Sequence, residues 1–179
     1  MKTRRVLVLL LAVLFVSLCG TVFAYMFSRT GEHTYQLQPA TVSCTVQESF
    51  DGDQKTSIQI QNTGTIDAYL RVRLVSYWKN ADGQIIGKAS VIPPFGLATD
   101  WIAGPNNTYY YKSPVAPDGT TPNLLSSAMT LAEVDEDGNR QVIEVFAEAI
   151  QSLPQSTVST SWNVSVDSAT GNLTSATSP

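Results

Sequence analysis

The sequence AYLRVRLVSYW occupies residues 68–78, and this segment decides the fold. Leu70, Val72 and Leu74 share one face of it, while a tyrosine and two arginines occupy the positions between and beside them. Strict alternation of apolar and polar side chains is typical of a β-strand with one buried face. The segment therefore predicts a β-strand, the clearest one in the sequence.

Shorter segments of the same kind surround this strand. Residues 41–47 alternate through Val42, Cys44 and Val46, and residues 57–61 alternate through two isoleucines. Turn sequences separate these segments. They are recognised by Gly, Asn and Asp, because these residues adopt the backbone angles that tight turns need. These turns are Asp51-Gly52, Asn62-Thr63-Gly64 and Asp82-Gly83, the last of which leads into a hairpin strand at residues 84–91.

The second half of the domain contains a long loop region and two further strands. Six prolines lie in residues 92–123, interrupted by a short strand at residues 109–111. Asp137-Gly138 predicts a hairpin turn between residues 129–134 and 141–151. Residues 141–151 also tolerate a helical interpretation, but their alternation and leading β-branched residues favour a strand.

After Pro154 the chain becomes rich in Ser and Thr, with 13 such residues among the 28 from Ser152 to the end. Trp162, Val164 and Val166 alternate there and predict a last strand. Several short strands without a long amphipathic helix favour one all-β domain, a single jelly-roll-like β-sandwich over residues 41–166. Residues 167–179 are expected to form a disordered Ser/Thr-rich tail.

The N-terminus carries an export signal over residues 1–24, expected as a helix. Three basic residues precede an uncharged apolar run over residues 6–19, and Val22-Phe23-Ala24 supplies the small or β-branched residues that a signal peptidase accepts. Cleavage is therefore expected after Ala24. The alternative is an uncleaved anchor, because the uncharged stretch 6–27 is long enough to span a bilayer of about 30 Å.

Charge and cysteine content exclude several classes of partner and of fold. Residues 1–24 carry three of the eleven basic residues and none of the fifteen acidic ones, so their removal changes the net charge from −4 to −7. A chain this acidic, without a basic cluster, suits neither nucleic acid nor anionic membrane surfaces. Cys44 alone remains after cleavage, so no internal disulfide is expected, and Cys44 is interpreted as a small core residue.

No catalytic, cofactor-binding or metal-binding residue is assigned from the sequence, and no enzyme activity is expected. His33 is the single histidine, which excludes metal sites built from several histidines, and no GxSxG motif is present. Residues 135–139 (DEDGN) resemble a cation loop but lack the EF-hand pattern. A hairpin tip explains this cluster better, with weak Ca²⁺ binding left open.

The remaining candidates are interpreted as structural. Arg71 and Arg73 are expected to pair with Glu144 and Glu148 if their strands are neighbours. The aromatic residues are expected in or beside the core, with a ligand-binding aromatic surface as the minority alternative. They are Trp78, Trp101, Trp162 and the run Tyr109-Tyr110-Tyr111.

Several motifs, taken in order, resemble one family. Residues 20–27 (GTVFAYMF) resemble signals processed by the SipW-type signal peptidase of Gram-positive bacteria. Residues 62–72 (NTGTIDAYLRV) are similar to a characteristic strand of the BsaA-type, SipW-dependent biofilm matrix proteins. Trp78, Trp101 with the three tyrosines, and residues 145–151 (VFAEAIQ) extend the likeness over most of residues 41–165.

The resemblance implies a secreted structural subunit of a biofilm matrix or pilus-like fibre, related to TasA and camelysin and found outside the cell or at its surface. It implies a jelly-roll-like fold, and self-association by addition of an N-terminal strand to the next subunit's sheet. Residues 25–40 are the possible donor strand, which is mobile before assembly. Camelysin is described as a metalloprotease, and a single histidine argues against that activity here. The alternative function is a monomeric cell-surface module that binds a glycan or peptide through residues 92–123.

Overall fold

The structure is a computed structural model that describes residues 3–4, 13–17 and 39–176. The chain divides into two units, residues 1–39 and residues 40–179. In the first unit, residues 3–4 and 13–17 are helical, and the rest of the expected signal helix lies outside the described residues. None of the described helices is long and apolar enough to cross a membrane.

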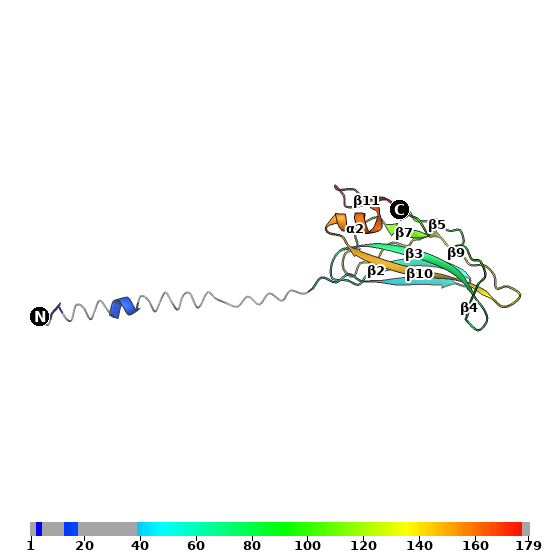
Figure 1. Ribbon diagram of the computed structural model, residues 1–179, viewed down its shortest axis with the longest axis horizontal. Coiled ribbons are helices and arrows are strands. Elements are labelled where there is room, and N and C mark those ends of the chain that lie inside the picture. The colour runs from blue at the N-terminus through cyan, green and yellow to red at the C-terminus, as the bar shows by residue number, and fades with distance from the viewer. Residues whose placement is uncertain (1–2, 5–12, 18–38, 177–179) are drawn as a thin grey trace. The chain divides into compact units, whose positions relative to one another are not determined.

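The regular secondary structure of the second unit is mostly β-strand, so the all-β prediction is confirmed (Figure 1). Most strands are short, and the two longest have twelve residues each. The elements are β1 (Cys44–Asp51), β2 (Gln54–Asn62), β3 (Ala68–Lys79), β4 (Ile85–Ile86), β5 (Gly96–Leu97), β6 (Trp101–Ala103), β7 (Thr108–Tyr111), β8 (Leu125–Ser127), β9 (Met129–Thr130), β10 (Arg140–Gln151), α2 (Gln155–Trp162), β11 (Val164–Val166) and β12 (Leu173–Ala176).

Four antiparallel sheets contain these strands. The largest has the order β10-β3-β7-β6, with β4 paired to the far end of β3. A second sheet has the order β1-β2-β9, and β5-β8 and β11-β12 form two small pairs. The large sheet is thus organised around β3, the strand that the sequence pattern identified most clearly.

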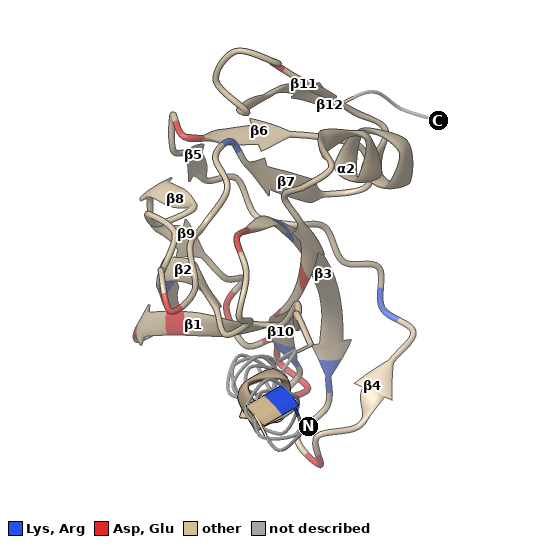
Figure 2. Ribbon diagram, turned by 90° about the vertical axis from the view of Figure 1, so that its left-hand side faces the viewer, with Lys and Arg blue, Asp and Glu red and all other residues tan. Residues whose placement is uncertain are grey.

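The main core contains residues of both larger sheets, whose strands Figure 2 shows. Ile58 and Ile60 of β2 and Leu70, Val72 and Leu74 of β3 are at most 1% exposed and belong to one apolar cluster. Their spacing of two residues places each set on one face of its strand, as the alternation predicted. Burial of side chains of this size stabilises the fold by about 1.5–3 kcal/mol each.

A second apolar cluster covers the opposite face of the large sheet. Tyr69 of β3 and Tyr110 of β7 pack there with Trp162, Val158 and Leu173. Val158 and Trp162 are four residues apart, so they lie on the same face of helix α2. The helix ends at Asn163, whose positive φ of 52° gives the left-handed cap common at helix ends.

Two predictions for the C-terminal region are wrong. Trp162 was expected in a strand but ends helix α2, because it packs with Val158 on the second cluster. Residues 167–179 were expected to be a disordered tail, but residues up to 176 are ordered through strand β12. Leu173 is 2% exposed, and its backbone N–H donates to the carbonyl of Lys112 at 2.8 Å.

The prediction of a hairpin at Asp137-Gly138 is also wrong, because the strands on either side of the turn do not pair with each other. The turn itself is present, because Gly138 N–H donates to the carbonyl of Asp135. Its flanking strands do not pair with each other, since β9 pairs with β2 and β10 pairs with β3. Turn sequences fix local backbone shape, whereas the partner of a strand depends on residues far away in the chain.

Candidate functional site

Two strand edges of the fold are open. β10 lies at one end of the large sheet and β1 at one end of the sheet β1-β2-β9. Across residues 39–176, neither strand has a hydrogen-bonded neighbouring strand on its outer side. Unpaired strand edges present backbone donors and acceptors that a further strand can use, so soluble proteins normally cover or interrupt them.

The hydrogen-bonding pattern shows which groups of β10 face outward. Leu74 N–H donates to the carbonyl of Asn107, so even-numbered residues of β3 direct their backbone groups towards β7. Odd-numbered residues of β3 therefore bond to β10, opposite its even-numbered residues. The N–H and C=O groups of Val145, Ala147 and Ala149 consequently point away from the sheet.

Partly buried apolar side chains follow the same two edges. Cys44 and Val46 of β1 and Val145, Ala147 and Ala149 of β10 pack against the main core but remain partly exposed. Burial raises the pKa of the Cys44 thiol, and the nearby Glu148 carboxylate raises it further. We call these two outer edges, with these five side chains, the seam.

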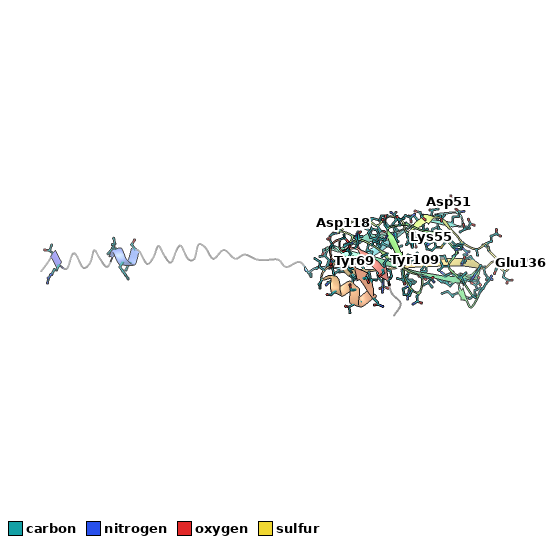
Figure 3. All side chains as sticks on the ribbon, turned by 90° about the horizontal axis from the view of Figure 1, so that it is seen from above. Asp51, Lys55, Tyr69, Tyr109, Asp118 and Glu136 are labelled. Carbon is teal, nitrogen blue, oxygen red and sulfur yellow. The ribbon has the colours of Figure 1, made fainter. Side chains whose placement is uncertain are left out.

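A buried lysine, Lys55 (labelled in Figure 3), contacts both strands of the seam. Lys55 Nζ donates to the outward-facing carbonyl of Ile143 at 3.2 Å and lies 3.0 Å from Glu48 Oε1. The ring of Phe50 lies beside it, with the ring centroid 4.7 Å from Nζ. Because the Lys55 ammonium group occupies the carbonyl of Ile143, an added strand cannot pair there. The edge of β10 is open from Val145 onward.

The sequence pattern does not predict that Lys55 is buried. The pairing of β1 with β2 shifts register between Ser49 and Phe50, so that Ser49 pairs with Ser57 but Phe50 pairs with Lys55. Such a bulge inserts one residue and turns the following side chain to the opposite face. Simple alternation from the isoleucines of β2 places Lys55 in solvent. The neighbouring Asp51-Gly52-Asp53 turn is the only sequence signal for an irregularity.

The loop after β2 fixes the start of the sheet β1-β2-β9. Asn62 is fully buried; its side-chain amide donates to the carbonyls of Ile66 and Val115, both at 2.8 Å, and its oxygen accepts from Gly64 N–H. Thr65 N–H donates to the carbonyl of Thr41 at 2.9 Å. A Cβ atom on Gly64 would lie 2.4 Å from that carbonyl oxygen, so only glycine fits.

Ion pairs of Arg71 and Arg73 with glutamates of β10 were predicted, and the one of Arg71 is confirmed. Arg71 and Glu148 are cross-strand partners, and Arg71 Nη2 lies 2.6 Å from Glu148 Oε2. Arg73 lies opposite Phe146 instead of Glu144, and it has no ion pair within residues 39–176. Both Arg71 and Glu148 are partly exposed, so their pair adds at most about 1 kcal/mol.

The aromatic residues lie in or beside the core, as predicted. Trp78, Trp101, Trp162 and Tyr110 are at most 7% exposed. The partly buried Tyr111 packs on Trp101, with ring centroids 5.5 Å apart. Each described tryptophan is therefore occupied by protein contacts, and none offers an open ring for stacking of a sugar.

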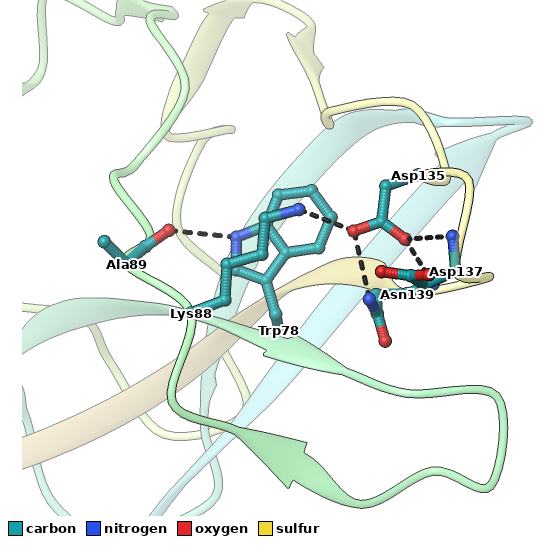
Figure 4. Close-up of polar contacts among 6 residues, drawn as sticks. All are labelled: Trp78, Lys88, Ala89, Asp135, Asp137 and Asn139. Atoms are coloured by element: carbon teal, nitrogen blue, oxygen red, sulfur yellow. Dashed lines mark hydrogen bonds and ion pairs between the residues drawn. The ribbon is translucent and has the colours of Figure 1, made fainter.

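The acidic cluster forms a closed turn (Figure 4). Asp135 Oδ1 accepts from the backbone N–H of Asn139 at 2.8 Å, and its Oδ2 lies 2.6 Å from Lys88 Nζ. The hydrogen bond from Lys88, followed by that from the Asn139 side chain, lowers the pKa of Asp135 to about 2. The described residues hold no group of three or more side chains suited to a metal ion.

Comparison of the chain with known proteins identifies no relative. No family model, no curated protein and no solved structure matches this chain. The remaining sequence candidate, His33, lies outside the described residues, as does most of the segment 25–40.

Proposed function

We propose that this protein is a secreted structural subunit of an extracellular matrix or pilus-like fibre, assembled by β-strand addition. The observation that carries the proposal is the seam, where two unpaired strand edges meet over partly buried apolar side chains. A further strand placed there gains backbone hydrogen bonds and buries apolar surface at once. The incoming strand is residues 25–40 of another copy.

The sequence of this segment suits the role. Residues 33–38 (HTYQLQ) place Tyr35 and Leu37 two positions apart, so an extended strand carries both on one face. Pro39 follows and ends the run. The chain then enters the domain at Thr41, where the Thr65 backbone and hydroxyl groups hold it. This anchor separates the donor segment from the folded domain.

Export and fold complete the proposal. Residues 1–24 direct secretion and are removed by a signal peptidase of the SipW type, so that Tyr25 begins the mature chain. The domain is a jelly-roll-like β-sandwich, with its two larger sheets on either side of the main core. The likeness to BsaA-type matrix proteins supports this interpretation, and residues 62–72, which carry part of that likeness, include the buried Asn62 and the obligatory Gly64.

A single substitution in β10 tests the role of the seam. Ala147→Pro removes an N–H group that points outward and leaves the hydrogen bonds to β3 in place. Ala147→Ser keeps the N–H group and serves as the matched control. Light scattering of the mature chain at micromolar concentration is expected to show growth into filaments for the wild type and Ala147→Ser, and at least tenfold slower growth for Ala147→Pro.

Equal growth of the two variants would exclude β10 as the acceptor strand. Deletion of residues 25–40 is expected to abolish growth, and unchanged growth kinetics after this deletion would exclude the donor segment. A wild-type chain that stays monomeric at every concentration would instead favour the alternative, a monomeric surface module that binds a glycan or peptide.

A further inference from the structure

A second opening interrupts the large sheet along β3, on the side opposite β10. β7 pairs with Arg71–Arg73, and β4 pairs only with Trp78 and Lys79. Between them, Leu74 N–H bonds to Asn107, but the Leu74 carbonyl and both backbone groups of Ser76 face this opening. Within the described part of the chain, no backbone hydrogen bond fills these three positions.

The opening has a local cause in the path of the chain after β4. Continuation of the β4 register would place Lys88 opposite Ser76, but the ladder ends at Ile86. Lys88 instead lies over the ring of Trp78, 3.8 Å from its centroid, and ion-pairs with Asp135 (Figure 4). Trp78 Nε1 also donates to the carbonyl of Ala89 at 3.1 Å. These contacts join residues 88–89 to the side chain of Trp78, while the β4 ladder with the β3 backbone ends at Ile86.

A cavity of about 690 Å³ occupies the opening, with residues 73–76 of β3 along one side and residues 90–92 and 106–107 around it. A second cavity of about 350 Å³ adjoins it and shares Ile92 and Asn107. Its other lining residues are largely apolar and include Phe95 and Tyr109. Cavities of this size hold small ligands or short peptide segments. We call the two together the β3 groove.

The charge at the groove is positive. Arg73 lines the larger cavity and forms no ion pair with any described residue, and neither cavity is lined by an acidic side chain. Lys55, Arg71 and Lys88, by contrast, each have a carboxylate partner. A ligand with a carboxylate near Arg73 therefore gains a charge-assisted hydrogen bond that no side chain of the domain supplies.

We infer that the β3 groove binds a short extended peptide of a partner protein, with a carboxylate beside Arg73 and an apolar side chain in the smaller cavity. The peptide backbone pairs with the Leu74 carbonyl and with the N–H and carbonyl of Ser76, as in β-strand addition. This surface is separate from the seam, because it lies on the other edge of β3 from β10. Its role does not depend on fibre assembly.

Fluorescence polarisation with a defined probe tests the inference. The probe is a labelled, end-blocked pentapeptide, Thr-Val-Glu-Val-Thr, and the comparison peptide carries Lys in place of Glu. The mature chain is expected to bind the Glu peptide at least tenfold more tightly than the Lys peptide. Arg73→Gln is expected to remove this preference, whereas Arg140→Gln, which removes an exposed charge from β10, is expected to keep it.

Two N-methylated versions of the Glu peptide test the backbone contacts. In a bound strand, every second amide points to β3 and the amides between them point to solvent. One version is methylated at the amides that point to β3, and the other at the amides that point to solvent. Only the first version is expected to lose binding. The Ala147→Pro variant is expected to bind normally. No binding, equal binding of the Glu and Lys peptides, an equal effect of both methylation phases, or loss of binding in Ala147→Pro would each overturn the inference.

Discussion

At the scale of single residues, Asn62 connects three parts of the chain. Its side chain bonds to Ile66, Val115 and Gly64 while fully buried, so the loop after β2 and residue 115 are held together by one amide. Buried polar groups contribute most when every partner is satisfied, and they cost most when one partner is removed. The sequence indicated a tight connection at Asn62-Thr63-Gly64, but not that Asn62 lies at its centre.

We expect Asn62→Ala to lower the free energy of unfolding by about 2–3 kcal/mol, because buried carbonyl and N–H groups lose their partner. Urea denaturation followed by tryptophan fluorescence measures the change. Thr45→Ala, at an exposed position of β1, is the control and should stay within about 0.5 kcal/mol of the wild type. An Asn62→Ala protein as stable as this control would contradict the assigned role.

The acidic turn predicts a pH dependence. The pKa of Asp135 is lowered from 3.8 to about 2 in the folded chain, so this carboxylate stabilises the fold at pH values above 3.8. Its contribution is lost as the pH falls through about 2, where the folded form also becomes protonated. The unfolding free energies of the wild type and Asp135→Asn are therefore expected to converge between about pH 4 and pH 2. Parallel curves over this range would refute the coupling to Lys88.

At the scale of elements, helix α2 stabilises the large sheet from its second face. Trp162 packs on Tyr110, with ring centroids 5.8 Å apart, and the guanidinium carbon of Arg71 lies 4.6 Å from the ring of Trp162. The C-terminal region is therefore part of the folded domain up to β12.

Trp162→Ala is expected to lower the free energy of unfolding by about 3–5 kcal/mol, because it leaves a large cavity beside Tyr69 and Tyr110. Thr160→Ala, on the exposed face of α2, should change it by less than about 0.5 kcal/mol. Denaturation curves of both variants measure the difference. A small effect of Trp162→Ala would mean that the helix does not cover the sheet in solution.

The sequence predicted the strands better than their partners. Alternation identified residues 68–78 and 141–151 because both have one face in the core. It could not show that β10 pairs with β3 instead of β9, since pairing over many residues leaves no local pattern. Helix α2 was missed because only Val158 and Trp162 carry its apolar face, within a Ser/Thr-rich sequence that also suits a disordered tail.

The seam was predictable only in part. A released N-terminal strand and an open sheet edge were expected, but the edge itself emerged from the pairing of β10 with β3. The burial of Lys55 could not be predicted, because it depends on the register shift between Ser49 and Phe50. Lys55 in turn decides where the open edge of β10 begins, since it occupies the carbonyl of Ile143. The β3 groove depends on where the β4 ladder ends, which the sequence does not show.

At the scale of the whole molecule, we propose that residues 25–40 of one copy add to the open strand edge of another. An acidic chain resists indiscriminate association, so assembly needs a specific contact, and the seam supplies backbone groups and apolar side chains together. A strand that each copy adds to the next one forms an open chain of subunits. In the proposed assembly, the seam of one copy and the N-terminal segment of the next are the two halves of one interface.

The most direct test of this proposal is disulfide cross-linking to Cys44, the one cysteine of residues 25–179. Cysteines are introduced singly at four donor positions, and oxidation is carried out at alkaline pH because burial raises the pKa of the Cys44 thiol. The variants are Thr34→Cys, Tyr35→Cys, Gln36→Cys and Leu37→Cys.

The proposed assembly predicts a ladder of disulfide-linked multimers on a non-reducing gel, absent when Ala147→Pro is added. The ladder is expected to be strongest for Tyr35→Cys or Leu37→Cys, because these two side chains share the apolar face of the donor strand. Monomers alone from all four variants, or multimers that persist unchanged with Ala147→Pro, would contradict it.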